Sequence, residues 1–125
     1  MKLKHLNQEN NLRQEIAKYY VENIKNESIT CPELPSFRDS HVWHLFTIRT
    51  KNRQELHNFL LKEKIQTVIH YPIPPHKQKA YAELNNLSFP ITEKIHEEIL
   101  SLPLYPHLEK NHIDKIIETV NIFEN

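Results

Sequence analysis

The segment HVWHLFTIRT, residues 41–50, gives the clearest strand signal in the chain. β-branched and aromatic side chains dominate it, and these pack well on the pleated surface of a sheet. Side chains alternate along a strand, so Phe46 and Ile48 fall on one face and Trp43 and Leu45 on the other. Both faces therefore carry apolar residues, which predicts a strand in the interior of a sheet.

A helix is expected directly after this strand. Asn52 stands at an N-cap position, with Glu55 three residues later as in a capping box. Leu56, Phe59 and Leu60 then recur at helical spacing and are expected to face inward. The helix is expected to end near residue 64, a lysine where glycine is the usual stop.

Outside this unit, residues 3–25 predict a long helix, because apolar side chains recur at steps of three and four. Residues 26–40 contain two prolines and predict a connector with a short extended piece at 29–31. Residues 65–70 predict a second strand. A helix is expected from Ser88 and Pro90, and ILSLPLYP (99–106) predicts a third strand. A last helix begins near Asn111 with the apolar stripe Ile113, Ile116, Ile117, Val120 and Phe123.

These elements predict an α+β fold. A long N-terminal helix precedes a small three-stranded sheet, and the helices pack mainly on one face of that sheet. We expect residues 1–28 to form the leading helix and residues 29–125 to form the small domain.

Composition excludes several function classes. The 125 residues are 38% hydrophobic, enough for one modest core. Sixteen basic residues balance sixteen acidic ones, so no basic surplus favours nucleic acid as a partner. No apolar run is long enough to span a membrane, and the polar start has no signal-peptide core. One cysteine fits a reducing compartment, and a cytoplasmic location is expected.

Glycine is absent from the sequence, although average usage is about 7%. A P-loop or a dinucleotide-binding fingerprint needs glycine where the backbone meets phosphate, so both are excluded. Any phosphate would have to be bound by side chains, a non-glycine nest or a helix N-terminus.

No metal site is expected from the nine histidines. His41 and His44 are three apart, which places them on opposite faces of a strand. His96 begins a sequence like that of a zinc protease helix, but residue 100 is leucine where the second histidine should be. Cys31 lies in a proline-rich connector and is expected to be an inert thiol.

Arg49, Lys51 and Arg53 cluster where the first strand meets its helix. They could bind a phosphate with help from the helix N-terminus. The alternative, which we favour, is an ordinary solvated strand end.

The segment TVIHYPIPPHKQKAY, residues 67–81, contains two histidines, two tyrosines and three prolines. It allows two interpretations. Prolines fix φ and remove donors, so the segment could be a rigid structural corner. Alternatively, its rigidity could organise His70, Tyr71, His76 and Gln78 around a sugar or nucleotide, which such rings and amides suit.

Four segments in order resemble the C-terminal domain of the DegT/DnrJ/EryC1/StrS family of pyridoxal-phosphate-dependent aminotransferases, which act on nucleotide-linked keto-sugars. These are LKHLNQENNLRQEIAKYY (3–20), HLFTIRTKNR (44–53), IQTVIHYPIPPHKQKAY (65–81) and FPITEKIHEEILSLPLYP (89–106). The resemblance covers nearly the whole chain. Lys64 stands where family members often have glycine.

The resemblance implies a domain that lines substrate without performing the chemistry. Family members are much longer, and their Schiff-base lysine and most of the phosphate cup precede this region. We therefore expect no catalytic residue and no bound pyridoxal phosphate (PLP) in this chain alone. The resemblance assigns substrate binding to His70, Tyr71, His76 and Gln78, with a dTDP-3-keto-6-deoxyhexose as the implied substrate.

Two other functions stay open. The chain could be a dimerisation or docking module for a separately encoded large domain, because a domain separated from its partner exposes apolar surface. It could also be a relic without activity.

Overall fold

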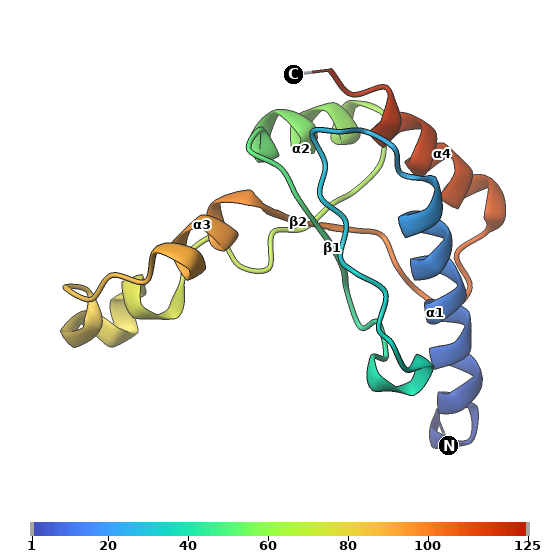
Figure 1. The fold of residues 1–125 in the computed structure, drawn as a ribbon, viewed down its shortest axis with the longest axis horizontal. Helices are drawn as coiled ribbons and strands as arrows, with labels where there is room; N and C mark the ends of the chain where they lie inside the picture. Colours follow the sequence, from blue (N-terminus) through green and yellow to red (C-terminus); the bar gives the residue numbers. More distant parts are fainter. Residues whose placement is uncertain (1, 125) are drawn as a thin grey trace.

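The computed structural model describes residues 2–124. In chain order, its main elements are α1 (Leu6–Asn23), β1 (Phe46–Arg49), α2 (Arg53–Lys62), α3 (Pro90–Glu98), β2 (Ile99–Leu102) and α4 (Lys110–Asn121). Short 3-10 turns lie at Lys2–His5, Arg38–Ser40, Pro75–Lys77 and Lys79–Leu84. In Figure 1, α1, α2 and α4 gather around the two strands, whereas the chain that includes α3 projects away from them.

One hydrophobic core lies between the sheet and helices α1, α2 and α4. Phe46 and Ile48 of β1 are fully buried, and their ladder partners Leu102 and Leu100 are buried on the same face. The ring of Tyr20 packs against Phe46 at 4.9 Å between centroids, and its hydroxyl donates to the carbonyl of Pro103. The helices add Ile16, Ala17, Leu56, Leu60, Ile113, Ile116, Ile117 and Val120. The inward faces predicted for α2 and α4 are confirmed.

The first strand is shorter than residues 41–50 predict, because Trp43 interrupts it. Trp43 has φ 51°, in the left-handed region, and its N–H donates to Nδ1 of His41 at 2.9 Å. Its indole is buried and packs 5.8 Å from the Phe46 ring. The turn places the largest side chain of this segment in the core, so regular pairing starts only at Phe46.

The strand predicted at residues 65–70 is wrong: across residues 2–124 the sheet has two strands and not three, and these strands, β1 and β2, pair antiparallel. The segment forms a single bridge, Val68 with Ser101. The next bonded pairs would involve residue 103, a proline without an N–H, and Ile99, whose N–H still bonds to Ile95 of α3. Each of these next pairs therefore lacks one of its two hydrogen bonds, and the ladder stops at the single bridge.

The opposite edge of β1 carries a similar single bridge, in which Thr30 and Arg49 exchange both backbone hydrogen bonds. Pro32 follows two residues later and has no N–H for the next bonded pair. β1 thus has neighbours on both edges, although only β2 forms a full ladder with it.

Helix α2 ends at the expected place in a Schellman motif built without glycine. The N–H of Ile65 bonds to the carbonyl of Leu60 at 2.8 Å, and that of Lys64 bonds to Leu61 at 3.0 Å. Lys64 supplies the left-handed residue with φ 63°. Left-handed backbone costs a residue with a Cβ about 1 kcal/mol or more, so the stop forms despite its sequence.

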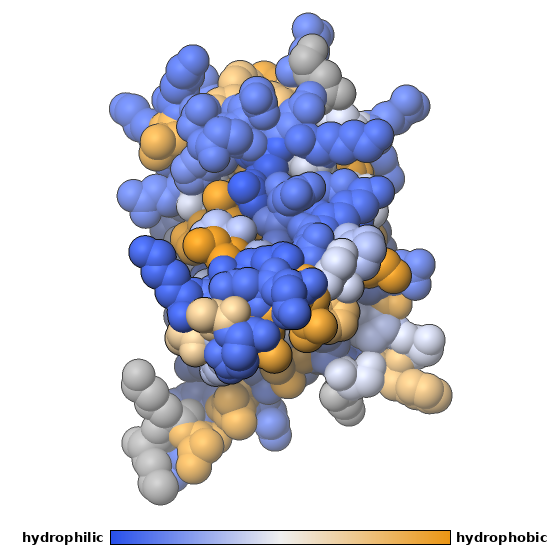
Figure 2. Space-filling view, turned by 90° about the vertical axis from the view of Figure 1, so that its left-hand side faces the viewer, coloured by the Kyte–Doolittle hydropathy of each residue, from blue (hydrophilic) through white to orange (hydrophobic). Residues whose placement is uncertain are grey.

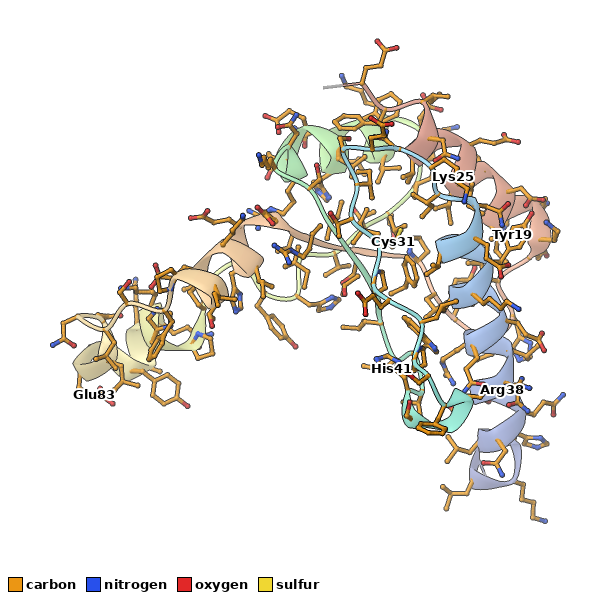
Figure 3. The ribbon with its side chains drawn as sticks, viewed as in Figure 1. Tyr19, Lys25, Cys31, Arg38, His41 and Glu83 are labelled. Carbon is orange, nitrogen blue, oxygen red and sulfur yellow. The ribbon has the colours of Figure 1, made fainter. Side chains whose placement is uncertain are left out.

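We call residues 71–98 the arm. It comprises the proline segment (residues 71–78), which includes the 3-10 turn Pro75–Lys77, then the 3-10 turn Lys79–Leu84, and finally α3. Glu83 lies at its far end (Figure 3). Within these residues, all of which the structure describes, His76 is the single buried residue. Figure 2 views the molecule from the side to which the arm points and shows apolar side chains among the hydrophilic ones. Large exposed apolar residues of the arm are Tyr71, Ile73, Tyr81, Leu84, Leu87, Phe89 and Ile91.

Candidate functional site

The four residues predicted to bind substrate separate into two groups. His70 and Tyr71 lie at the root of the arm, with their rings perpendicular and 5.5 Å apart. Tyr71 is 65% exposed and His70 is partly exposed. His76 and Gln78 lie further along and contact other parts of the arm. The Gln78 side chain donates to the carbonyl of Ile73 at 3.2 Å.

His76 forms the small interior of the arm. Its Nε2 lies 2.9 Å from Oε1 of Glu93, and its ring meets Phe89 edge-on at 4.9 Å. The same Glu93 oxygen accepts the N–H of Phe89 at 3.0 Å, where α3 begins. The Phe89 N–H and then His76 stabilise the carboxylate, which lowers the pKa of Glu93. His76 therefore joins the proline segment to α3.

Polar contacts connect the root of the arm to α2 and β1. The carbonyl of Tyr71 can only accept, so the ring Nδ1 of His96 donates to it. The His96 carbonyl in turn accepts from Nη1 of Arg53. Arg49 binds Glu98 through Nε at 3.1 Å and Nη2 at 2.7 Å. These contacts fix the path of the chain where the arm leaves the sheet.

Two of the three cations considered for a phosphate site are engaged in these ties. Arg49 pairs with Glu98 and Arg53 with the His96 carbonyl, whereas Lys51 is exposed. The described structure therefore uses Arg49 and Arg53 as anchors for α3.

A small hollow of about 140 Å³ opens on the sheet near His70, and we call it the open-face groove. Ser101 of β2 is buried at its base, and its Oγ lies 2.9 Å from Nδ1 of His70. The lining residues are His44, Leu45, Gln66, Val68, His70, Ser101, Leu102, Pro103 and Leu104. Apolar walls with a few polar groups are typical of ligand sites.

Sequence reasoning missed Ser101, Glu93 and His96. Ser101 carried a signal, because it is the one hydroxyl in the apolar run ILSLPL. Glu93 and His96 resemble ordinary residues of a solvated helix. Their roles depend on contacts with residues that lie 17 and 25 positions away.

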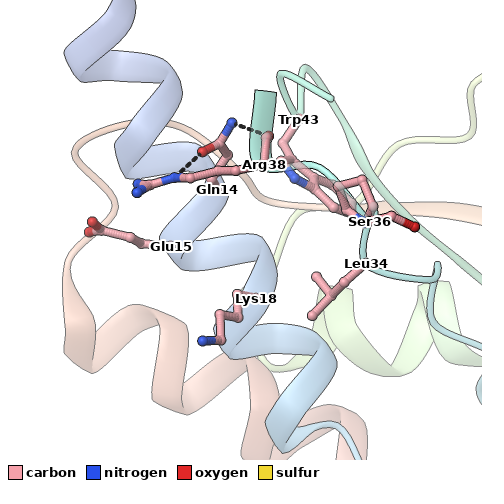
Figure 4. A pocket seen from close by; sticks show the side chains of 8 residues that line it. Gln14, Glu15, Lys18, Leu34, Ser36, Arg38 and Trp43 are labelled. Atoms are coloured by element: carbon pink, nitrogen blue, oxygen red, sulfur yellow. Dashed lines mark hydrogen bonds between the residues drawn. The ribbon is translucent and has the colours of Figure 1, made fainter. Parts of the chain in front are cut away.

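A second, larger groove of about 510 Å³ lies between α1 and the connector (Figure 4). Gln14 donates to the backbone carbonyl of Arg38 at 2.8 Å and accepts from Nε of Arg38 at 2.8 Å. Leu34 and the buried Trp43 form one wall, and charges of both signs lie opposite. None of the predicted site residues lines this groove.

Neither a metal site nor a reactive thiol is evident in residues 2–124. In that range no group of three or more His, Cys, Asp or Glu residues could hold a metal ion. Burial raises the pKa of the Cys31 thiol, against a smaller opposing effect of Lys25. No helix of the described residues is long and apolar enough to cross a membrane.

Comparison with known proteins gives one consistent result. A model of the DegT/DnrJ/EryC1/StrS aminotransferase family matches residues 1–121. The chain is 48% identical over 121 residues to the dTDP-3-amino-3,6-dideoxy-alpha-D-galactopyranose transaminase of Aneurinibacillus thermoaerophilus, covering 97% of this chain and 33% of the relative.

Solved structures agree. The crystal structure of DesV from S. venezuelae in complex with a ketimine intermediate superposes with a TM-score of 0.89 at 36% identity, over 96% of this chain and 33% of that one. The Bacillus subtilis protein NtdA, with bound cofactor PMP, gives a TM-score of 0.81 at 32% identity, over 90% of this chain and 28% of that one. The chain thus spans about a third of the length of the relatives it matches.

Proposed function

Because the chain belongs to the DegT/DnrJ/EryC1/StrS aminotransferase family, we propose that it is the C-terminal part of a PLP-dependent sugar aminotransferase. The complete enzyme transfers an amino group to a nucleotide-linked keto-sugar such as a dTDP-3-keto-6-deoxyhexose. This part, in the cytoplasm, lines the substrate and has no activity alone. The division into a leading helix, 1–28, and a small domain, 29–125, belongs to the same proposal.

The residues present do not fit the cofactor. A Schiff-base lysine needs surroundings that lower its pKa. Every lysine whose side chain the structure describes is exposed, and the pKa of Lys110 is raised, first by its hydrogen bond to Asp114. A glycine-lined phosphate cradle is also impossible in a chain without glycine. We therefore assign PLP binding to the remaining two thirds of the enzyme.

The observation that carries the proposed substrate surface is the position of His70 in the open-face groove, with the exposed ring of Tyr71 against it. His70 lines the groove beside Ser101, and Tyr71 exposes an aromatic face next to it. Stacking faces with polar tips suit a sugar or a nucleobase. In this proposal His70 and Tyr71 touch the ligand and Gln78 adds to the substrate surface from the arm. The buried His76 contributes to substrate binding by holding that part of the arm against Glu93.

A nitrogen–proton correlation spectrum of the labelled protein, recorded with and without dTDP-glucose, tests this function. We expect the amides of His70, Tyr71 and Ser101 to shift. Glucose alone and dTDP alone are the matched controls, and each should shift fewer of these amides. A spectrum that dTDP-glucose leaves unchanged at these three residues would refute the substrate surface.

The exposed arm favours a second function, a dimerisation or docking module. A segment of this length with one buried residue gains little from burial to offset its conformational entropy. The partner would be a second copy of the chain or a separately encoded large domain. Sedimentation velocity over a wide concentration range, alone and with a relative's large domain, distinguishes these partners. A constant monomer mass in both experiments would contradict docking.

A further inference from the structure

Resting on the proposed substrate surface, we propose that Ser101 is a positioning residue that fixes the tautomer of His70. Ser101 donates to Nδ1, so the ring presents Nε2–H to the open-face groove as a hydrogen-bond donor. That donor recognises an acceptor oxygen of the sugar, either a carbonyl or a hydroxyl. Specificity at this point then depends on a buried serine whose hydroxyl bonds to His70 and not to the ligand.

The location of Ser101 makes its hydroxyl a fixed partner. Its backbone N–H donates to Val68 at 2.8 Å, and its carbonyl accepts from Val68 at 3.2 Å. Its side chain is buried, with the residue 4% exposed. Within residues 2–124, this hydroxyl forms one hydrogen bond, and its partner is His70.

The proton inventory of this pair selects one tautomer. A neutral imidazole has one donor nitrogen and one acceptor nitrogen, and a serine hydroxyl has a single proton. If Nδ1 carried the ring proton, the buried Ser101 proton would have no acceptor, which is unfavourable. If Ser101 donates to Nδ1, both groups are satisfied and the ring proton lies on Nε2.

The surroundings of His70 leave its Nε2–H available to a ligand. Its Nε2 makes no hydrogen bond within the described residues. Leu45, Val68 and Leu104 line the same groove, and a hydrogen bond is stronger in such an apolar setting than in water. A single oriented donor among apolar walls distinguishes ligands by where they place an oxygen.

The tautomer is measured without any ligand. Long-range nitrogen–proton spectra of the imidazoles are recorded at about pH 8.5, well above the ordinary histidine pKa. We expect His70, identified by its absence in His70→Gln, to show a proton-bearing Nε2 and a bare Nδ1. Ser101→Ala should move both nitrogen shifts toward a mixture of tautomers. His44→Gln, in the same groove, should leave them unchanged.

A second titration tests recognition with dTDP-glucose. His70→Gln retains a side-chain N–H near the position of Nε2, so its apparent Kd should stay within about twofold of the unaltered protein. His70→Leu should weaken binding about five- to tenfold, as expected for one lost hydrogen bond.

The two measurements separate the inference from the proposed function. A proton on Nδ1, or tautomers unaffected by Ser101→Ala, would overturn the inference even if dTDP-glucose binds. The expected tautomer with equal Kd values for the Gln and Leu variants would overturn the recognition step. The expected tautomer without any binding would refute the substrate surface itself and, with it, recognition by His70.

Discussion

The guanidinium of Arg49, at the end of β1, holds the carboxylate of Glu98, the last residue of α3, with Nη2 2.7 Å from Oε2. One residue further on, the N–H of Thr50 donates to the Glu98 carbonyl at 3.1 Å. These contacts attach the arm to the sheet. Because the arm is otherwise exposed, its orientation depends strongly on this junction.

Loss of this ion pair should destabilise the protein modestly. Arg49→Met is expected to lower the unfolding free energy by about 1 kcal/mol, because the Arg49 side chain is 39% exposed and surface pairs are weak. Urea denaturation gives the value. Lys94→Met is the matched control, since Lys94 lies 3.9 Å from the same carboxylate and is 61% exposed. A loss for Lys94→Met as large as that for Arg49→Met would contradict the role of Arg49.

Glycine at position 64 should stabilise the chain. Lys64→Gly relieves the left-handed backbone at the end of α2, and we expect a gain of about 0.5–1 kcal/mol after the entropy cost of glycine. The urea midpoint should rise without a change in slope. Lys62→Gly, at the last residue of the helix, should instead lower the unfolding free energy, by at most about 1 kcal/mol. A lower midpoint for Lys64→Gly would show that the lysine side chain itself contributes.

The core should respond sharply to truncation at position 60 and weakly at position 61. Leu60 is fully buried whereas its neighbour Leu61 is 53% exposed. Leu60→Ala should cost about 2–5 kcal/mol, since a cavity forms between α2 and the sheet. Leu61→Ala should cost less than about 1 kcal/mol. Thermal and urea unfolding measure both variants. Similar losses of unfolding free energy at the two positions would show that the inward face of α2 is assigned incorrectly.

Acid should weaken the arm through Glu93. The pKa of Glu93 is lowered in the folded state from 4.5, so its stabilisation is fully present above that value and disappears as pH falls through the lowered pKa. Glu93→Gln should therefore be less stable than the unaltered protein near neutral pH, and the difference should shrink in acid. Unfolding free energies between about pH 3 and pH 7 measure it. Glu97→Gln, at an exposed position of the same helix, is the control. A difference that grows in acid would reverse the assigned sign.

Local patterns predicted the elements and their inward faces well. The apolar steps predicted helices in residues 3–25, from Asn52 to about residue 64 and from near Asn111, and the inward residues predicted for the last two are buried or partly buried. ILSLPLYP predicted β2, which ends just before Pro103. The strand predicted at residues 65–70 does not form, because a ladder depends on its partner strand as well. Val68 forms only a bridge, because on the partner segment the N–H of Ile99 bonds to α3 and residue 103 has no N–H. Neither fact can be read from residues 65–70.

The sequence by itself determined roughly where the four main helices and the strands β1 and β2 lie, and most of the side chains that face the core. These follow from periodicity and backbone chemistry, which act over a few residues. The tertiary structure alone decided which polar atoms meet. His76 became an interior residue because Glu93 and Phe89 fold back onto it. His70 stayed at the surface with Ser101 behind it, because β2 brings that hydroxyl from 31 residues away. Such pairings depend on long-range packing, which no local pattern encodes.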